Sequence, residues 1–238
     1  IGAPIVIEFA NLSTNWDQVN LDNISFSTAG TATTLPGTQL GALTLITQDA
    51  TLLVPDQFPN INVALRYLDD KQIKVGKTVT IQVTDCDNQV YTESVEIAHP
   101  NGDAIHIIGN TESPESCVLR FENVNGFVAQ NGNRIGLIDG FHILGNATQE
   151  ERMSGIVANH HSYIRLGNSI IVDSFSNGIS SYENSTIYAT NVKAINNLNH
   201  GFVSSVSSTI TANNTISENN GYGFLAENSN FSRICSEN

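Results

Sequence analysis

The chain has 238 residues and a formal net charge of −13, although only 14% of its residues are charged. An acidic surface repels phosphate groups and no cluster of Lys and Arg stands out, so nucleic-acid binding and adhesion to an anionic membrane are both disfavoured. No apolar run reaches the roughly 20 residues that a membrane-spanning helix needs, so we expect no helical membrane insertion.

The residue types that fill the chain favour β-structure. Apolar residues make up 40%, which is enough for a core, and Ser, Thr, Asn and Gly replace the missing charged residues. β-branched residues are plentiful, whereas the helix formers Lys and Glu are scarce, and this pattern indicates an all-β protein. The length suits one large domain or a domain with a smaller appendage.

Residues 1–57 contain short β-like runs that Gly and Pro interrupt. We interpret them as a separate β-rich region or arm, with its boundary at residues 54–59. The chain starts at Ile1 and shows no charged segment followed by an apolar one, so we expect a processed or trimmed terminus and not a signal peptide.

Residues 59–73 form the one segment with a helical apolar pattern. Ile61, Ala64, Leu65 and Leu68 follow the spacing i, i+3, i+4, i+7, which predicts an amphipathic helix. Asn60 is a suitable N-cap, because its side chain can accept a hydrogen bond from the first turn.

Residues 78–122 predict the first strands of a larger β-domain, at residues 78–83, 105–110 and 117–122. The chain has three cysteines, Cys86, Cys117 and Cys235, with no CxxC pair and no His at zinc spacing. The odd number argues against a disulfide framework, so we expect all three to be small core residues.

A Gly-containing motif recurs along the second half of the chain. All steps between its glycines are nearly equal except the first, which is longer; they are Gly126, Gly155, Gly178, Gly201 and Gly223. The excess in the first step falls at residues 147–153, a charged segment that we interpret as a loop insertion. Such a period indicates a repeat architecture.

Further columns of residues keep the same period. Apolar columns contain Ile164, Ile187 and Ile210, then Leu166, Ala189, Ala212 and Ile234; polar columns contain Asn168, Asn191 and Asn214, then Asp173, Asn196 and Asn219. Apolar residues come in short alternating groups with turn residues between them, which predicts three short strands per repeat. We expect the Asn columns to form ladders of side-chain amides, and the Gly column to occupy positions that need a positive φ or a tight turn.

Repeats of roughly 20 to roughly 25 residues are typical of leucine-rich repeats and parallel β-helices. The LxxLxLxxN pattern is absent and no helix fits within the repeat. We therefore predict an all-β fold, a right-handed single-stranded parallel β-helix over residues 58–238 with coils of about 23 residues, and with the helix at residues 59–73 as its N-terminal cap. Because Asn238 falls in mid-coil, we expect the β-helix to be truncated at that end.

Residues 58–125 resemble the start of the pectate-lyase-like β-helix domains of bacteriophage tail fibres and tailspikes. The resemblance depends on an "ALxYL" helix, a "VTIxV" strand with a later Tyr, and an "hPxGxxIxIxG" strand; the matching residues are Ala64, Leu65, Tyr67, Leu68, 79–83, Tyr91, His99, Pro100, Gly102, Ile105, Ile107 and Gly109. The chain departs from the family at 86–88, where members usually have Gly.

The resemblance implies a homotrimeric virion protein that attaches to a host-surface polysaccharide, with residues 1–57 joining other tail or baseplate proteins. It implies an extracellular location in the phage tail. Two alternatives stay open: a polysaccharide lyase or glycoside hydrolase on the same fold, and a secreted bacterial surface adhesin. Fold alone does not choose between them.

Carboxylates on neighbouring coils, and one histidine beside them, are the candidate catalytic groups, since glycosidases use carboxyl pairs about 5 to 9.5 Å apart. The candidates are Glu183, Asp173 and His160, followed by Glu218 and Glu227. His160 and Glu183 occupy the same position in consecutive repeats, so we expect them to be neighbours that could exchange a proton.

We expect no metal and no cofactor. His160 and His161 are adjacent on a strand-like segment and would point to opposite sides, which makes a poor chelate. A pectate lyase needs a calcium-binding Asp cluster with a basic residue, but no Asp cluster is evident, and Arg134, Arg165 and Lys193 do not suggest one set. No phosphate-binding loop, GxSxG, HExxH or EF-hand motif occurs.

Overall fold

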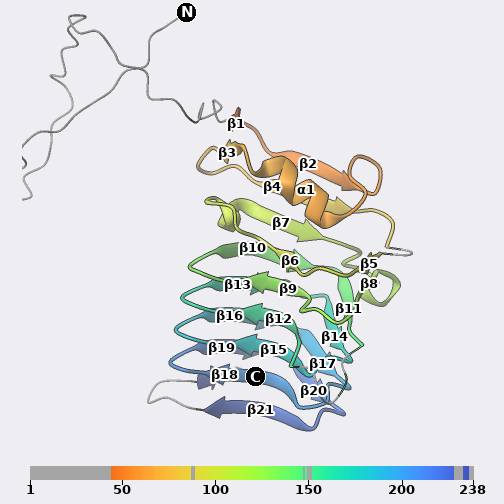
Figure 1. The fold of residues 1–238 in the computed structure, drawn as a ribbon, viewed down its shortest axis with the longest axis vertical. Helices are drawn as coiled ribbons and strands as arrows, with labels where there is room; N and C mark the ends of the chain where they lie inside the picture. Colours follow the sequence, from red (N-terminus) through yellow and green to blue (C-terminus); the bar gives the residue numbers. More distant parts are fainter. Residues whose placement is uncertain (1–43, 87–88, 147, 149–151, 228–232, 236–238) are drawn as a thin grey trace, which may run out of the picture. The chain divides into compact units, whose positions relative to one another are not determined.

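The computed structural model describes residues 44–86, 89–146, 148, 152–227 and 233–235. The chain divides into two units, Ile1–Gln39 and Leu40–Asn238, and the described residues all belong to the second. That unit is a stack of parallel β-strands (Figure 1). Most of the N-terminal region that we expected at residues 1–57 lies outside the described residues.

Three parallel sheets make up the stack. Sheet I contains β2 (Ala50–Val54), β4 (Val79–Val83), β7 (Ile105–Ile108), β10 (Arg134–Asp139), β13 (Tyr163–Leu166), β16 (Thr186–Thr190), β19 (Thr209–Asn213) and β22 (Arg233–Cys235). Sheet II contains β5 (Val90–Tyr91), β8 (Val118–Phe121), β11 (Phe141–Leu144), β14 (Ile170–Asp173), β17 (Val192–Ile195) and β20 (Ile216–Glu218). Sheet III contains β6 (Val95–Glu96), β9 (Phe127–Ala129), β12 (Ser154–Ala158), β15 (Asn177–Ser181), β18 (His200–Ser205) and β21 (Tyr222–Glu227).

From β4 onward the chain visits sheets I, II and III in turn, and we call each such passage a coil. This order is compatible with a right-handed parallel β-helix. Strand partners come from consecutive repeats, as in Tyr163↔Thr186 on sheet I and Ile170↔Val192 on sheet II. Inward-facing side chains stack in columns, and the column of Ile164, Ile187 and Ile210 is fully buried.

The helix is shorter than the sequence pattern predicted. Helix α1 covers Ile61–Leu68, and Asn60 caps it by accepting a hydrogen bond from the backbone N–H of Val63 at 3.0 Å. Residues 71–73 were wrongly assigned to the helix, because β3 (Lys71–Ile73) pairs instead with β1 (Thr44–Ile46). The apolar helical period ends at Leu68, and backbone pairing then stabilises the extended segment.

Helix α1 packs against the first strands, contacting β2, β4 and β6. Its apolar face is buried there, through Ile61, Ala64, Leu65 and Leu68. Strand β2 pairs with β4 at the end of sheet I, so the parallel stack extends upstream of the boundary that we expected at residues 54–59.

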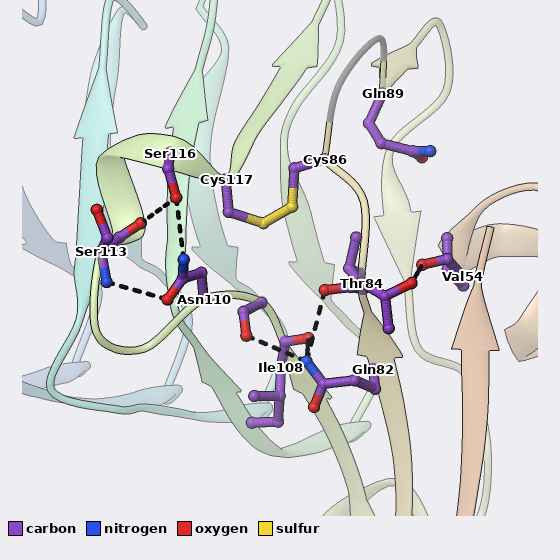
Figure 2. Close-up of a disulfide and its surroundings, with 12 residues drawn as sticks. Val54, Gln82, Thr84, Cys86, Gln89, Ile108, Asn110, Ser113, Ser116 and Cys117 are labelled. Atoms are coloured by element: carbon purple, nitrogen blue, oxygen red, sulfur yellow. Dashed lines mark hydrogen bonds between the residues drawn. A yellow bond between two sulfur atoms is a disulfide. The ribbon is translucent and has the colours of Figure 1, made fainter. Parts of the chain in front are cut away.

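Two of the cysteines form a disulfide, contrary to our expectation. Cys86 and Cys117 are bonded, and Figure 2 shows the bridge between the segment after β4 and the start of β8. The turn before Cys117 includes a 3-10 helix at Pro114–Ser116, and Asn110 Oδ1 accepts the backbone N–H of Ser113 at 3.1 Å. Counting cysteines missed this pair, because the Cα atoms come within 4.8 Å only when the coils stack.

The Gly column also has a different cause from the one we predicted. Gly155, Gly178 and Gly201 lie within β12, β15 and β18 and do not adopt a positive φ. A Cβ atom at Gly178 would lie 2.6 Å from the carbonyl oxygen of Gly201 on the next coil. Close approach between coils therefore selects Gly here.

Candidate functional site

The first Asn column is a ladder on the surface of the stack. The Asn191 side-chain amide donates to Asn168 Oδ1 at 3.3 Å, and that of Asn214 donates to Asn191 Oδ1. Asn191 and Asn214 have φ of 53° and 50°, a left-handed conformation that Asn tolerates better than most residues. The ladder bonds and the left-handed turns therefore give these Asn residues a structural role in joining neighbouring coils.

The second polar column does not have the register that we predicted. Asp173 is paired with Ile195, so Asn196 aligns with Ser174. Ser174, Asn196 and Asn219 share a left-handed backbone, with φ between 52° and 59°. The register shifts because the step from β14 to β17 is one position shorter than the step from β13 to β16. Asn196 still donates to Asp173 Oδ1 at 3.2 Å.

Two polar ladders, one of buried Ser residues and one of partly buried Asn residues, escaped the sequence reading. Ser162 N–H donates to Ser185 Oγ at 3.0 Å, and Ser185 N–H donates to Ser208 Oγ at 3.2 Å. In a second ladder, Asn197 Nδ2 donates to Asn220 Oδ1 at 2.9 Å. The constant separation of 23 residues between the members of the Ser ladder was the signal that could have revealed it.

His160 and Glu183 are neighbours in space, at the turn from sheet III to sheet I. His160 Nε2 lies 2.7 Å from Glu183 Oε2, and the side chains are 51% and 44% exposed. Both residues have positive φ, of 50° and 51°. Water screens a pair this exposed, and neither residue lines the two cavities described below.

Asp173 has a more sheltered partner that the sequence reading missed. His142 Nε2 lies 3.2 Å from Asp173 Oδ2, and the side chains are 20% and 13% exposed. Ser174 Oγ donates to the other carboxylate oxygen, Asp173 Oδ1, at 2.7 Å. The carboxylate is therefore well supplied with donors. Ile195 separates it from Glu218 in the strand register, so these two carboxylates do not form a close pair.

A cleft of about 450 Å³ lies on the outer face of sheet I, between β10, β13 and β16. This volume falls within the usual range of small-molecule sites. Its lining residues are Leu137, Asp139, Tyr163, Arg165, Leu166, Gly167, Asn168, Tyr188 and Thr190. The cleft combines two aromatic rings, a cation and several hydrogen-bonding groups.

Strand register brings the aromatic and basic residues of the cleft together. The rings of Tyr163 and Tyr188 lie 5.7 Å apart, and the Arg134 guanidinium carbon lies 4.6 Å from the Tyr163 ring centre. Arg165 pairs with Tyr188 in the strand register. Of the three basic residues that we considered, Lys193 lies on sheet II, whereas Arg134 and Arg165 share one face of sheet I.

The carboxylate at the edge of the cleft is held by the backbone. Asp139 Oδ1 accepts the N–H groups of Gly140 and Ser169, each at 2.9 Å. Two backbone donors stabilise the charge of this carboxylate and fix its position. The arrangement can bind a flat or ring-shaped ligand on the Tyr side chains while polar groups orient it.

A second cavity of about 450 Å³ lies beside α1 and β6. Within it, Asn62 Nδ2 donates to Glu93 Oε1 at 3.0 Å and to the backbone oxygen of Ser94 at 3.3 Å. These bonds join the helix to the segment before β6. We therefore assign this cavity to the docking of the helix.

Comparison with protein-family models, with curated proteins and with solved structures finds no match for this chain. Within the described residues, no helix is long and apolar enough to cross a membrane. The same residues contain no cluster of three or more His, Cys, Asp or Glu side chains arranged to hold a metal ion.

Proposed function

We propose that this chain is a right-handed parallel β-helix from a bacteriophage tail fibre or tailspike, and that it binds a polysaccharide on the host surface. The aromatic cleft on sheet I carries this proposal. Aromatic side chains offer a large apolar surface with little entropy to lose, and the C–H face of a sugar ring can pack against it. The polar lining residues would then bond to the hydroxyl groups.

The similarity of residues 58–125 to tail-fibre and tailspike domains supports the virion assignment. In such an assembly the chain would act as a homotrimer, with residues 1–57 binding other tail proteins. Stacked coils give a long side surface, so a polymer can contact several coils at once.

The test is binding of the full chain to immobilised polysaccharides purified from bacterial capsules and outer membranes. We expect binding to at least one of them, from a preparation that sediments as a trimer. Tyr188→Ala should weaken that binding about tenfold, since an aromatic contact contributes about 1 kcal/mol beyond its buried area. Thr211→Ala, the next residue in the same column, should leave binding unchanged.

The same incubation tests the enzymatic alternative, which the His142–Asp173 contact favours. A lyase or hydrolase would release unsaturated or reducing ends, and Asp173→Asn or Glu183→Gln should then abolish that release. Failure of a folded, trimeric preparation to bind any polysaccharide would contradict the proposed function.

A further inference from the structure

The cations of the later coils gather at the cleft. Between residues 123 and 227 the sequence has four Lys and Arg residues: Arg134, Arg152, Arg165 and Lys193. Two of these four, Arg134 and Arg165, lie on the outer face of sheet I beside the two tyrosines. Arg165 and Asp139 line the cleft and Arg134 lies beside it over Tyr163, so the cleft and its edge carry a local excess of positive charge on a chain with a net charge of −13.

Arg165 is available to a ligand. In the part of the chain that the structure describes, none of the five ion pairs includes Arg134 or Arg165. The guanidinium of Arg134 is placed over the Tyr163 ring, whereas Arg165 lines the cleft itself. Burial, and secondly the positive charge of Arg165, lower the pKa of His106 on β7.

Asp139, the acidic residue among those that line the cleft, forms no ion pair with Arg165 among the described residues. Asp139 directs one carboxylate oxygen to the N–H groups of Gly140 and Ser169, so the backbone stabilises its charge. An Arg side chain presents a planar pair of donors that matches a carboxylate in a bidentate contact. A sugar ring on Tyr188 would bring a carboxylate substituent within reach of Arg165, because Arg165 and Tyr188 are paired in the register.

We propose that the cleft recognises an acidic polysaccharide, in which one ring packs on Tyr188 and its carboxylate binds Arg165. This inference rests on the proposed function and names the chemical class of its ligand. The acidic remainder of the surface repels any polyanion, but it disfavours a nucleic acid more strongly, because every nucleotide carries a phosphate and the charges are more closely spaced than carboxylates along a polysaccharide.

The experiment compares matched polymers with the full-length chain. Probes are polygalacturonate, polysialic acid and purified acidic capsular polysaccharides, each beside its carboxyl-reduced neutral form, together with a teichoic acid that carries only phosphate. We expect binding to an acidic polymer that falls at least about tenfold on carboxyl reduction.

Arg165→Gln should weaken binding to the acidic polymer about tenfold, and Arg165→Lys should restore part of the affinity, as the charge returns without the planar fork. Lys193→Gln is the matched control: it removes the same charge from sheet II and should leave binding unchanged. Both sites are exposed, so thermal unfolding should show that all variants fold.

The outcomes separate the two proposals. Equal binding of acidic and reduced polymers, lost in Tyr188→Ala but not in Arg165→Gln, would retain polysaccharide binding and overturn the acidic class. Selective binding of the teichoic acid would overturn the carboxylate assignment. Equal losses in Arg165→Gln and Lys193→Gln would show a general charge effect and overturn the site. Absence of binding to every polymer, acidic or neutral, would contradict both proposals.

Discussion

The first coils of the stack (residues 50–121) and the later coils (residues 154–227) are stabilised by different interactions. In the first coils the number of residues between strand partners varies. More residues separate Ala50 from its partner Val79 than separate Val79 from its partner Ile105. A helix and a disulfide join them, whereas stacked rings occur in both regions, as in Tyr91–Phe121 and Phe202–Phe224. The later coils have nearly constant steps and repeat the same contacts from coil to coil.

The difference shows what regular spacing provides. When each coil has the same length, one side-chain type can bond to its copy on the next coil, as in the Ser and Asn ladders. When coil length varies, no fixed number of residues separates the stacked partners, and in the first coils a helix and a disulfide add further contacts. Three changes test this comparison.

Loss of the disulfide should cause the largest decrease in unfolding free energy. The destabilised part should be the first coils, which the bridge joins. The Cys86→Ala/Cys117→Ala variant should lose about 3–4 kcal/mol of unfolding free energy, the value that chain entropy gives for a bridge with a sequence separation of 31. Urea unfolding followed by circular dichroism measures the loss. Reducing agent should destabilise the wild-type chain by a similar amount and leave the variant unchanged; equal stability of both chains would show that the bridge does not hold the first coils.

The later coils were the easier part to predict from sequence. Residues such as Ile164, Ile187 and Ile210 face one core at constant spacing, so the column is visible in a single sequence. The first coils also stack buried residues, such as Ile81 on Ile107, but the number of residues between partners varies, so no period reveals the column. The Cys86–Cys117 pair becomes close only through the way the turns of these coils stack. The helix was predicted to end too late because Ile73 is apolar and was counted with the helix. The structure buries Ile73 in strand β3.

The cleft was also hidden, because it depends on coils of unequal length. Arg134 pairs with Tyr163 and Arg165 pairs with Tyr188, but the first of these steps along the chain is longer than the second. The register of β10 also shifts between Ile135 and Ile138. No single period in the sequence brings Arg134 together with the cleft residues Tyr163, Arg165 and Tyr188. The position of the His160–Glu183 pair, by contrast, follows directly from the repeat.

Replacing a Gly of this column by Ala should cause the second largest loss of unfolding free energy. The size of the loss should differ from one coil to another. At Gly126 a Cβ atom would lie 2.2 Å from the carbonyl oxygen of Gly155, whereas at Gly223 the nearest described atom, Ser217 Oγ, would be 3.5 Å away. We expect Gly126→Ala to cost about 2–3 kcal/mol, as overpacking does, and Gly223→Ala to cost under about 1 kcal/mol. Calorimetric melting of both variants measures the difference; similar losses would rule out close approach as the reason for the column.

Two serines on one coil should respond to the same substitution with opposite sign. Ser185 is buried, and its Oγ accepts the N–H of Ser162 at 3.0 Å, so Ser185→Ala leaves a buried donor without its acceptor. Ser181 is fully buried too, but among the described residues its Oγ has no hydrogen-bond partner. Its inward column already holds Ala158 on the preceding coil, where a methyl group fits.

We therefore expect Ser185→Ala to lower the free energy of unfolding by about 1–2 kcal/mol and Ser181→Ala to raise it by about 1 kcal/mol. Urea unfolding of the two variants beside the wild-type chain measures both changes. The two variants are well matched, because residue type, burial and substitution are the same. The difference of interest is that Ser185 belongs to the Ser ladder and Ser181 does not. A loss of stability in Ser181→Ala would mean that this hydroxyl has a partner, and that the later coils depend on polar contacts beyond their ladders.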